Sequence, residues 1–244
     1  MKIFLKVGLT ILLASAPLAH ADYVTIGSQD GPNCYPFMCN DSSNTTGPSI
    51  DYQEVFNSSA FAGPGNIDFI SYTFDPGVGT ATFLGGDYAF YWGYSANGMT
   101  LSTVLPSNYV SGSKNYIGNV DIAPGGVEYG LGFTWEGFPP VTYDPADGDL
   151  LLEIVVTNQD GVPNGSGNGY NWADYTGTDV TRAYNISNPN ASAIAAGPDF
   201  SGIGALDTTF GGSIQAATPE PSGLLLLGTG LVGLVGAMRR KFAR

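Results

Sequence analysis

Asp149-Leu150-Leu151-Leu152-Glu153-Ile154-Val155-Val156-Thr157 is the stretch that decides the fold. Between Leu150 and Val156 every position except Glu153 is apolar, so apolar side chains point to both faces of an extended chain. Strands that are covered on both faces read as continuous apolar runs of this kind. The stretch therefore predicts a central, well-buried strand.

Three other runs of β-branched and aromatic residues resemble it, at residues 66–74, 87–94 and 127–135. Turn signals separate the runs: Asp75-Pro76-Gly77, Gly85-Gly86, Ala123-Pro124-Gly125-Gly126 and Asp147-Gly148. No helical periodicity occurs between the two ends of the chain, and residues 205–210 add a candidate last strand. The pattern predicts an all-β protein with a single antiparallel β-sandwich or jelly-roll domain over residues 50–215.

The first 21 residues have the pattern of a secretory signal peptide. Lys2 and Lys6 precede a short apolar core over residues 7–14, and Ala19-His20-Ala21 provides small residues for cleavage before Asp22. We therefore expect the chain to be exported, with residues 22–49 as an N-terminal segment ahead of the sandwich.

The last 27 residues, 218–244, have a different pattern. Pro219-Glu220-Pro221 precedes an uncharged, glycine-rich apolar run over residues 223–238, and four of the last six residues, 239–244, are basic. A helix of 16 residues spans roughly 24 Å, enough to cross a locally thinned bilayer as one transmembrane helix. The basic end should stay in the cytoplasm. The two prolines keep the peptide before the membrane extended, where a membrane-embedded enzyme could bind it.

This tail resembles the PEP-CTERM sorting signal of Gram-negative bacteria in the order and spacing of its three parts. The resemblance implies recognition at Pro219, Glu220 and Pro221 by an exosortase, a membrane processing enzyme. It also implies passage through the inner membrane, transient anchoring by the helix, and final placement at the cell surface or in an exopolysaccharide matrix. A plain C-terminal membrane anchor is the alternative, but it leaves Pro-Glu-Pro unexplained.

Two internal segments are similar to a β-sandwich domain of uncharacterised PEP-CTERM proteins. They are residues 52–61, Tyr-Gln-Glu-Val-Phe-Asn-Ser-Ser-Ala-Phe, and residues 140–154, which lead from a Tyr-Asp-Pro turn into the apolar strand. The resemblance supports the fold and implies no activity.

The exported part is strongly acidic. Six of the 8 basic residues lie in the end segments, which leaves Lys114 and Arg182, and of the 21 acidic residues only Glu220 is lost. The remaining net charge of −18 opposes binding to nucleic acid. The only histidine, His20, leaves with the signal peptide. Catalytic pairs and zinc sites that need histidine are therefore excluded.

Cys34 and Cys39 are the only cysteines. In an oxidising exported compartment, two cysteines this close in sequence are expected to close a small disulfide loop. A redox or metal pair is the alternative, but no further cysteine or histidine is present to complete it.

Asp144, Asp147 and Asp149 place three carboxylates within six residues, which suits a calcium ion. The spacing is not that of an EF-hand, and Asp-Pro and Asp-Gly are ordinary turn formers, so a structural turn is the preferred interpretation. No other cofactor is expected.

Aromatic side chains could also stack on sugars. Most of them should be core, and Tyr170 and Trp172, beside a glycine-rich loop, are the best candidates for exposed rings.

We therefore predict a non-enzymatic, matrix or surface protein that could bind carbohydrate or cations. A glycosidase with a carboxylate pair, drawn from Glu128, Glu136 and Glu153, is one alternative. Ser111-Gly112-Ser113-Lys114 has the Ser-x-x-Lys spacing of some acyl enzymes but lacks their partner motifs. An ice- or surface-binding protein is the other alternative, with few threonines to support it.

Overall fold

The computed structural model describes residues 23–37, 50–73, 81–83, 85–122, 125–127, 133–134, 139–160, 171–174, 176–185 and 204–217. In these residues the protein is all-β, and two larger antiparallel sheets pack face to face as a sandwich. The predicted fold class is confirmed.

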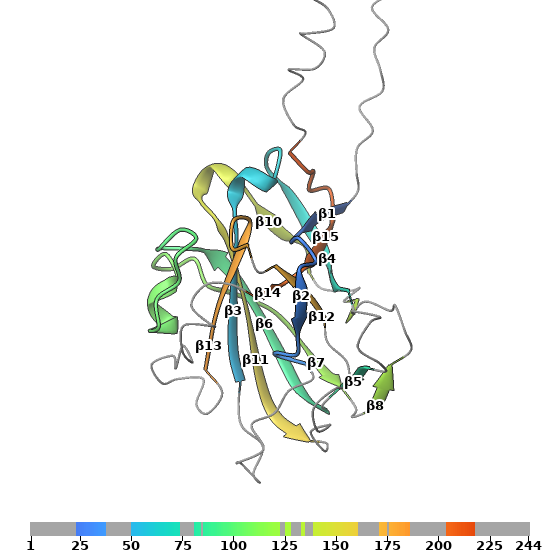
Figure 1. Cartoon of the computed structure of the whole chain (residues 1–244). Coiled ribbons are helices and arrows are strands. Elements are labelled where there is room, and N and C mark those ends of the chain that lie inside the picture. The colour runs from blue at the N-terminus through green and yellow to red at the C-terminus, as the bar shows by residue number, and fades with distance from the viewer. Residues whose placement is uncertain are drawn as a thin grey trace, which may run out of the picture.

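One layer is a five-stranded sheet in the order β13-β3-β11-β6-β7. Its strands are β3 (Ile50–Phe56), β6 (Gly85–Tyr94), β7 (Asn115–Ile122), β11 (Leu150–Asp160) and β13 (Val180–Asn185). The apolar run at residues 150–156 forms β11, the middle strand, as its sequence predicts. Figure 1 shows β3, β11 and β6 running side by side through the domain.

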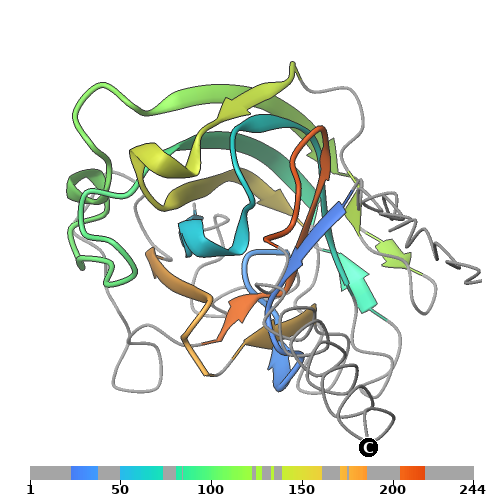
Figure 2. The same ribbon diagram turned by 90° about the horizontal axis from the view of Figure 1, so that it is seen from above.

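The facing layer has the order β1-β15-β4-β10, with β9 paired to β4. These strands are β1 (Tyr23–Ile26), β4 (Gly65–Tyr72), β9 (Phe133–Thr134), β10 (Val141–Tyr143) and β15 (Thr208–Gly212). Strands β1 and β15 come from opposite ends of the described chain and lie against each other (Figure 2). The N-terminal segment, expected to precede the sandwich, therefore supplies one of its strands.

Two small sheets complete the structure. One has the order β14-β12-β2, and the other pairs β5 with β8. Their bounds are β2 (Gly31–Asn33), β5 (Ala81–Phe83), β8 (Gly125–Val127), β12 (Asn171–Asp174) and β14 (Ala205–Leu206). The run at 127–135, expected as one strand, therefore contributes to β8 and β9, which pair with different partners. Gly85-Gly86, expected as a turn, begins β6 instead.

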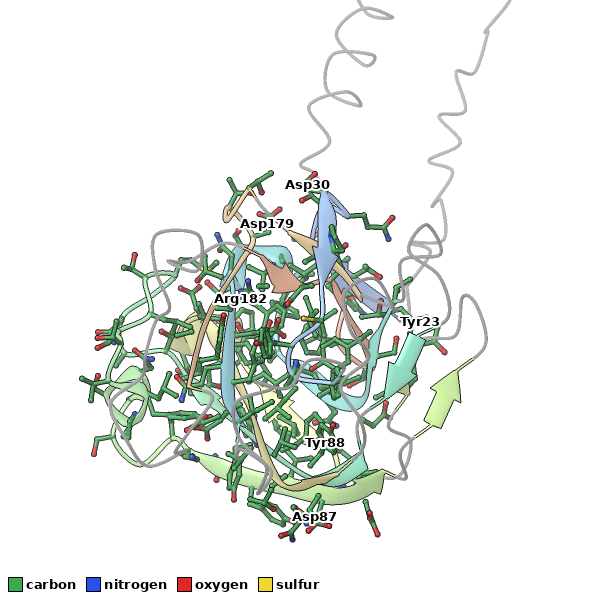
Figure 3. The ribbon with its side chains drawn as sticks, turned by 60° about the horizontal axis from the view of Figure 1, so that its bottom comes forward. Tyr23, Asp30, Asp87, Tyr88, Asp179 and Arg182 are labelled. Atoms are coloured by element: carbon green, nitrogen blue, oxygen red, sulfur yellow. The ribbon has the colours of Figure 1, made fainter. Side chains whose placement is uncertain are left out.

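Side chains alternate between the two faces of each strand. Tyr88 is fully buried, whereas Asp87, its neighbour in β6, lies on the opposite face, as Figure 3 shows. Large rings fill the space between the layers. The Phe56 and Phe210 rings, from β3 and β15, meet edge to face at 4.9 Å.

Candidate functional site

The outer face of the five-stranded sheet, turned away from the sandwich core, carries polar side chains on its central strands. In β11, Leu150, Leu152 and Ile154 point into the core, so Glu153 points outward. Glu153 lies opposite Gln53 of β3 and opposite Tyr91 of β6. Asp51 lies opposite Val155 and therefore occupies the diagonal position beside Glu153. Diagonal neighbours on one face are within reach of long side chains.

A loop over residues 95–114 covers part of this face. It contains the short 3-10 helix η3 (Leu105–Asn108), whose Leu105 packs with Ala183 of β13. The Gln53 side chain donates a hydrogen bond to the Leu105 carbonyl at 3.2 Å and accepts one from Asn108 at 2.8 Å. All of these residues are buried. The loop is therefore fixed to the sheet by matched polar groups as well as by apolar packing.

Gly93 lets the loop approach closely. A side-chain carbon at this position would lie 2.7 Å from the Tyr109 ring and 2.7 Å from the Ser113 carbonyl oxygen. The loop thereby places Tyr109, and Lys114 after it, over the centre of the sheet.

Four groups converge on the Glu153 carboxylate, which is only 2% exposed. Gln53 donates to Oε1 at 2.9 Å, and the Tyr109 hydroxyl donates to Oε2 at 3.3 Å. The Lys114 ammonium forms an ion pair with Oε2. The same ammonium lies 4.4 Å from the centre of the Tyr91 ring and 5.3 Å from that of Tyr109, so two aromatic faces flank it.

The fourth group is the Asp51 carboxyl, which shares a hydrogen bond with Glu153. Burial raises the pKa of Asp51 to about 9, and the nearby Glu153 charge adds to the effect, while Lys114 opposes it. At neutral pH Asp51 is therefore a carboxylic acid that can donate a proton. We name Asp51, Gln53, Tyr91, Tyr109, Lys114 and Glu153 the outer-face cluster.

A second polar group, the interior cluster, lies between the layers. It consists of Asn33, Tyr52, Glu54, Arg182 and Asp207, all of them buried. The Asn33 amide donates to the Tyr52 hydroxyl at 3.2 Å, and that hydroxyl donates to Glu54 at 2.7 Å. The Leu206 backbone N–H also donates to Glu54. This enclosed cluster ties β2, β3 and β14 together (Figure 3 labels Arg182), so its arrangement is structural.

The predicted calcium ligands have other roles in the structure. Asp144 caps the 3-10 helix η4 (Pro145–Asp147) by accepting from the Ala146 N–H at 2.9 Å. Asp149 accepts from the Ser58 N–H at 2.7 Å. Within the described residues no group of three or more His, Cys, Asp or Glu side chains could hold a metal ion. The turn interpretation accounts for these contacts, and calcium binding stays a prediction.

Several other predicted residues lie outside the described part of the chain. They are Cys39, Glu128, Glu136, Tyr170, Pro219, Glu220 and Pro221. Cys34 is in a disulfide, and Cys39 is its expected partner. Trp172 lies in β12 opposite Pro32, and its side chain is not described. Trp92 and Tyr94 of β6 pack against the core, as expected for most of the aromatic side chains.

Of the outer-face cluster, the sequence suggested Glu153 as one candidate for a glycosidase carboxyl and Lys114 as part of a Ser-x-x-Lys pattern without partner motifs. It gave no indication of Asp51 or Tyr109. The available signal was a pair of polar interruptions in otherwise strand-like segments. These are Glu153 within its apolar run, and Asp51-Tyr52-Gln53-Glu54, where three polar residues and one tyrosine lie between Ile50 and Val55. Buried polar groups of this kind need partners, so they mark places where distant segments must meet.

No helix among the described residues is long and apolar enough to cross a membrane. The expected transmembrane segment, 223–238, lies outside them.

Comparison with known protein families gives a match at the C-terminal end of the chain. Residues 217–241 match the PEP-CTERM protein-sorting motif, nearly the same boundaries that the sequence pattern predicts. No curated protein and no solved structure matches the chain. The motif marks a protein that is exported and directed by an exosortase to the cell surface or the extracellular space. The chain therefore carries a PEP-CTERM protein-sorting motif at residues 217–241.

Proposed function

We propose that the exported part is a non-enzymatic protein of the cell surface or exopolysaccharide matrix, sorted there through its C-terminal motif. The motif at residues 217–241 is the observation that carries the proposal. The filled aromatic core supports it, because a packed sandwich suits a durable scaffold. The carboxyls of the outer-face cluster also support it. Asp51 and Glu153 are buried, at 3% and 2% exposure, whereas the two carboxyls of a glycosidase flank a space that a sugar can enter.

We propose a neutral polysaccharide as the matrix ligand. The net charge of −18 on the exported part disfavours anionic polymers. On the outer face of β7, Tyr116 is 56% exposed, and its ring lies 5.3 Å from that of Tyr91. Exposed rings on a sheet face can stack on the apolar faces of sugars, and the exposed amide of Asn119 on the same strand can bond hydroxyl groups.

The sorting step is tested first, by the mass of the exported protein in a host that contains an exosortase. We expect wild type to end near Pro219–Ser222, and the Glu220→Ala variant to lose this processed species. A tail that remains intact to Arg244 in both proteins would overturn processed sorting. That outcome would leave an ordinary membrane-anchored surface domain.

Ligand binding is tested by co-sedimentation of the full chain with insoluble neutral polysaccharide. The Tyr116→Ala variant should lose about fivefold in affinity, since one stacked ring contributes on the order of 1 kcal/mol. Tyr23→Ala is the matched control, because Tyr23 is 57% exposed but lies on β1 of the other layer. Equal binding by both variants would exclude this face as the binding surface, without bearing on the sorting result.

A further inference from the structure

The outer-face cluster brings an amine and a carboxyl together in a fixed arrangement. Lys114 and Glu153 form an ion pair although 38 residues separate them in the chain. Glu153 is held at the middle of the central strand β11, and the loop that carries Tyr109 sets the position of Lys114. Groups held in this way react as if at very high concentration, because the entropy of bringing them together has already been lost on folding.

The surroundings of this pair favour acyl chemistry at Glu153. The Gln53 amide donates to Oε1, where negative charge would develop if a nucleophile attacked the carboxyl carbon. The Tyr91 and Tyr109 rings flank the amine. The Lys114 side chain as a whole is 41% exposed, so a released water molecule can leave.

We propose that Lys114 and Glu153 become joined by an intramolecular amide bond, with Asp51 as the acid–base catalyst. No external reagent is needed, since an ammonium and a carboxylate contain the atoms of one amide and one water molecule. The proposal does not depend on the identity of the matrix ligand.

The reaction begins when the Lys114 ammonium passes one proton to Oε2 of Glu153 across the ion pair, and the neutral amine then attacks the Cδ atom of the Glu153 carboxylic acid. The Nζ–Cδ bond forms, and the charge on Oε1 is stabilised by the Gln53 N–H. Asp51 then donates its proton to the departing oxygen, the Cδ–Oε2 bond breaks, and water leaves. The proton on the new amide nitrogen returns to Asp51. The Asp51 carboxyl is therefore unchanged at the end, as a catalyst must be.

The bond would connect strands that are not neighbours in the sheet. Lys114 directly precedes the edge strand β7, and Glu153 lies in β11, with β6 between them. The covalent link therefore passes over Tyr91 of β6 and joins the start of the edge strand β7 to the central strand β11. Such a link would hold the exposed edge of the sheet on a protein that works outside the cell, where no cellular machinery replaces unfolded chains.

The test is the intact mass of the exported full chain and its digestion by trypsin after denaturation and reduction. We expect the wild-type mass to be lower by one water molecule. Lys114 and Arg182 are the only trypsin sites between Lys6 and Arg239. An acylated lysine is not cleaved, so wild type should release no free fragment of residues 115–182. Lys114→Arg retains a trypsin site and the charge, and it should give the full mass and release that fragment.

Asp51→Asn and Glu153→Ala separate the roles of the two carboxyls. Glu153→Ala should abolish the link, and Asp51→Asn should slow its formation at least tenfold while the circular dichroism spectrum stays that of wild type. A wild-type chain of full mass that releases the 115–182 fragment would overturn the proposal. A link that forms at the wild-type rate in Asp51→Asn would overturn the catalytic role of Asp51.

Discussion

Glu54 of β3 and Arg182 of β13 lie directly opposite each other, and both side chains point into the interior of the sandwich. Glu54 is 1% exposed and Arg182 is 3% exposed. The Arg182 guanidinium also lies 5.3 Å from the centre of the Tyr184 ring. Charged groups this deeply buried are stable only with partners around them, so the interior cluster should be sensitive to protonation.

We predict that the protein loses stability as pH rises toward 8, because of Glu54. Burial raises the pKa of Glu54 to about 8, although the Leu206 N–H, Tyr52 and Arg182 all favour its charged form. The folded state therefore holds a proton that the unfolded state releases above about pH 4.5. Between about pH 4.5 and pH 8, the ionisation of Glu54 should therefore lower the free energy of unfolding by about 1 kcal/mol for each pH unit.

Urea unfolding at pH 5.5 and pH 7.5 measures this effect. In Glu54→Gln, which cannot ionise, the loss of stability between the two pH values should be smaller than in wild type. A loss of equal size in both proteins would assign the pH dependence to other groups.

Two strands of the five-stranded sheet, β11 and β6, could be predicted from their apolar and aromatic runs, but β3 and β7 could not. Strand β11 shows as a continuous apolar run because both of its faces are covered. Strand β3 is just as buried, but the polar residues Asp51, Gln53 and Glu54 interrupt its apolar pattern, so its sequence does not indicate a buried strand. These polar side chains form hydrogen bonds with partners that are brought near only by folding. Gln53, for example, donates to Glu153, which is 100 residues away in the chain. Edge strand β7 mixes polar and apolar residues and has no strong periodicity.

The same reasoning explains which parts of the candidate site could be predicted. The Asp144, Asp147 and Asp149 group was visible because the three residues are close in sequence, but proximity along the chain also suits helix capping and turn formation. The outer-face cluster draws its residues from β3, β6, the 95–114 loop and β11. No local pattern predicts that these four segments meet.

We predict that Gly93→Ala is destabilising by about 2 kcal/mol or more, a cost typical of overpacking against a rigid neighbour. The added carbon would lie 2.7 Å from a backbone oxygen, that of Ser113, and cannot be accommodated by rotating a side chain. Gly63→Ala is the control, because a carbon at Gly63 meets nothing within 4 Å. Urea unfolding of both variants checks the prediction, and an equal cost at the two positions would contradict the close packing of the loop.

Asn108→Ala should loosen the loop over the outer face. The buried Asn108 amide donates to Gln53 and to the Ser102 carbonyl, and its oxygen accepts from the Ser102 N–H and from Asn97. Removing it leaves buried groups unpaired, at a cost of about 1–3 kcal/mol. Hydrogen exchange at the Ser102 amide should accelerate, whereas Asn119→Ala, an exposed change on β7, should leave it unchanged. Unaltered exchange in Asn108→Ala would mean that apolar packing alone holds the loop.

Phe210→Ala should be the most destabilising of these substitutions, because Phe210 joins the two layers. Its ring comes from β15 of one sheet and meets Phe56 of β3, in the other sheet, at 4.9 Å. It also lies 5.8 Å from the Phe61 ring. Truncating a buried phenylalanine removes its own contacts and leaves a cavity, which costs about 3–5 kcal/mol. Val104→Ala, at a position 44% exposed, should change the free energy of unfolding by less than about 0.5 kcal/mol. If urea unfolding gave similar values for both variants, the packing of the two sheets through these rings would be contradicted.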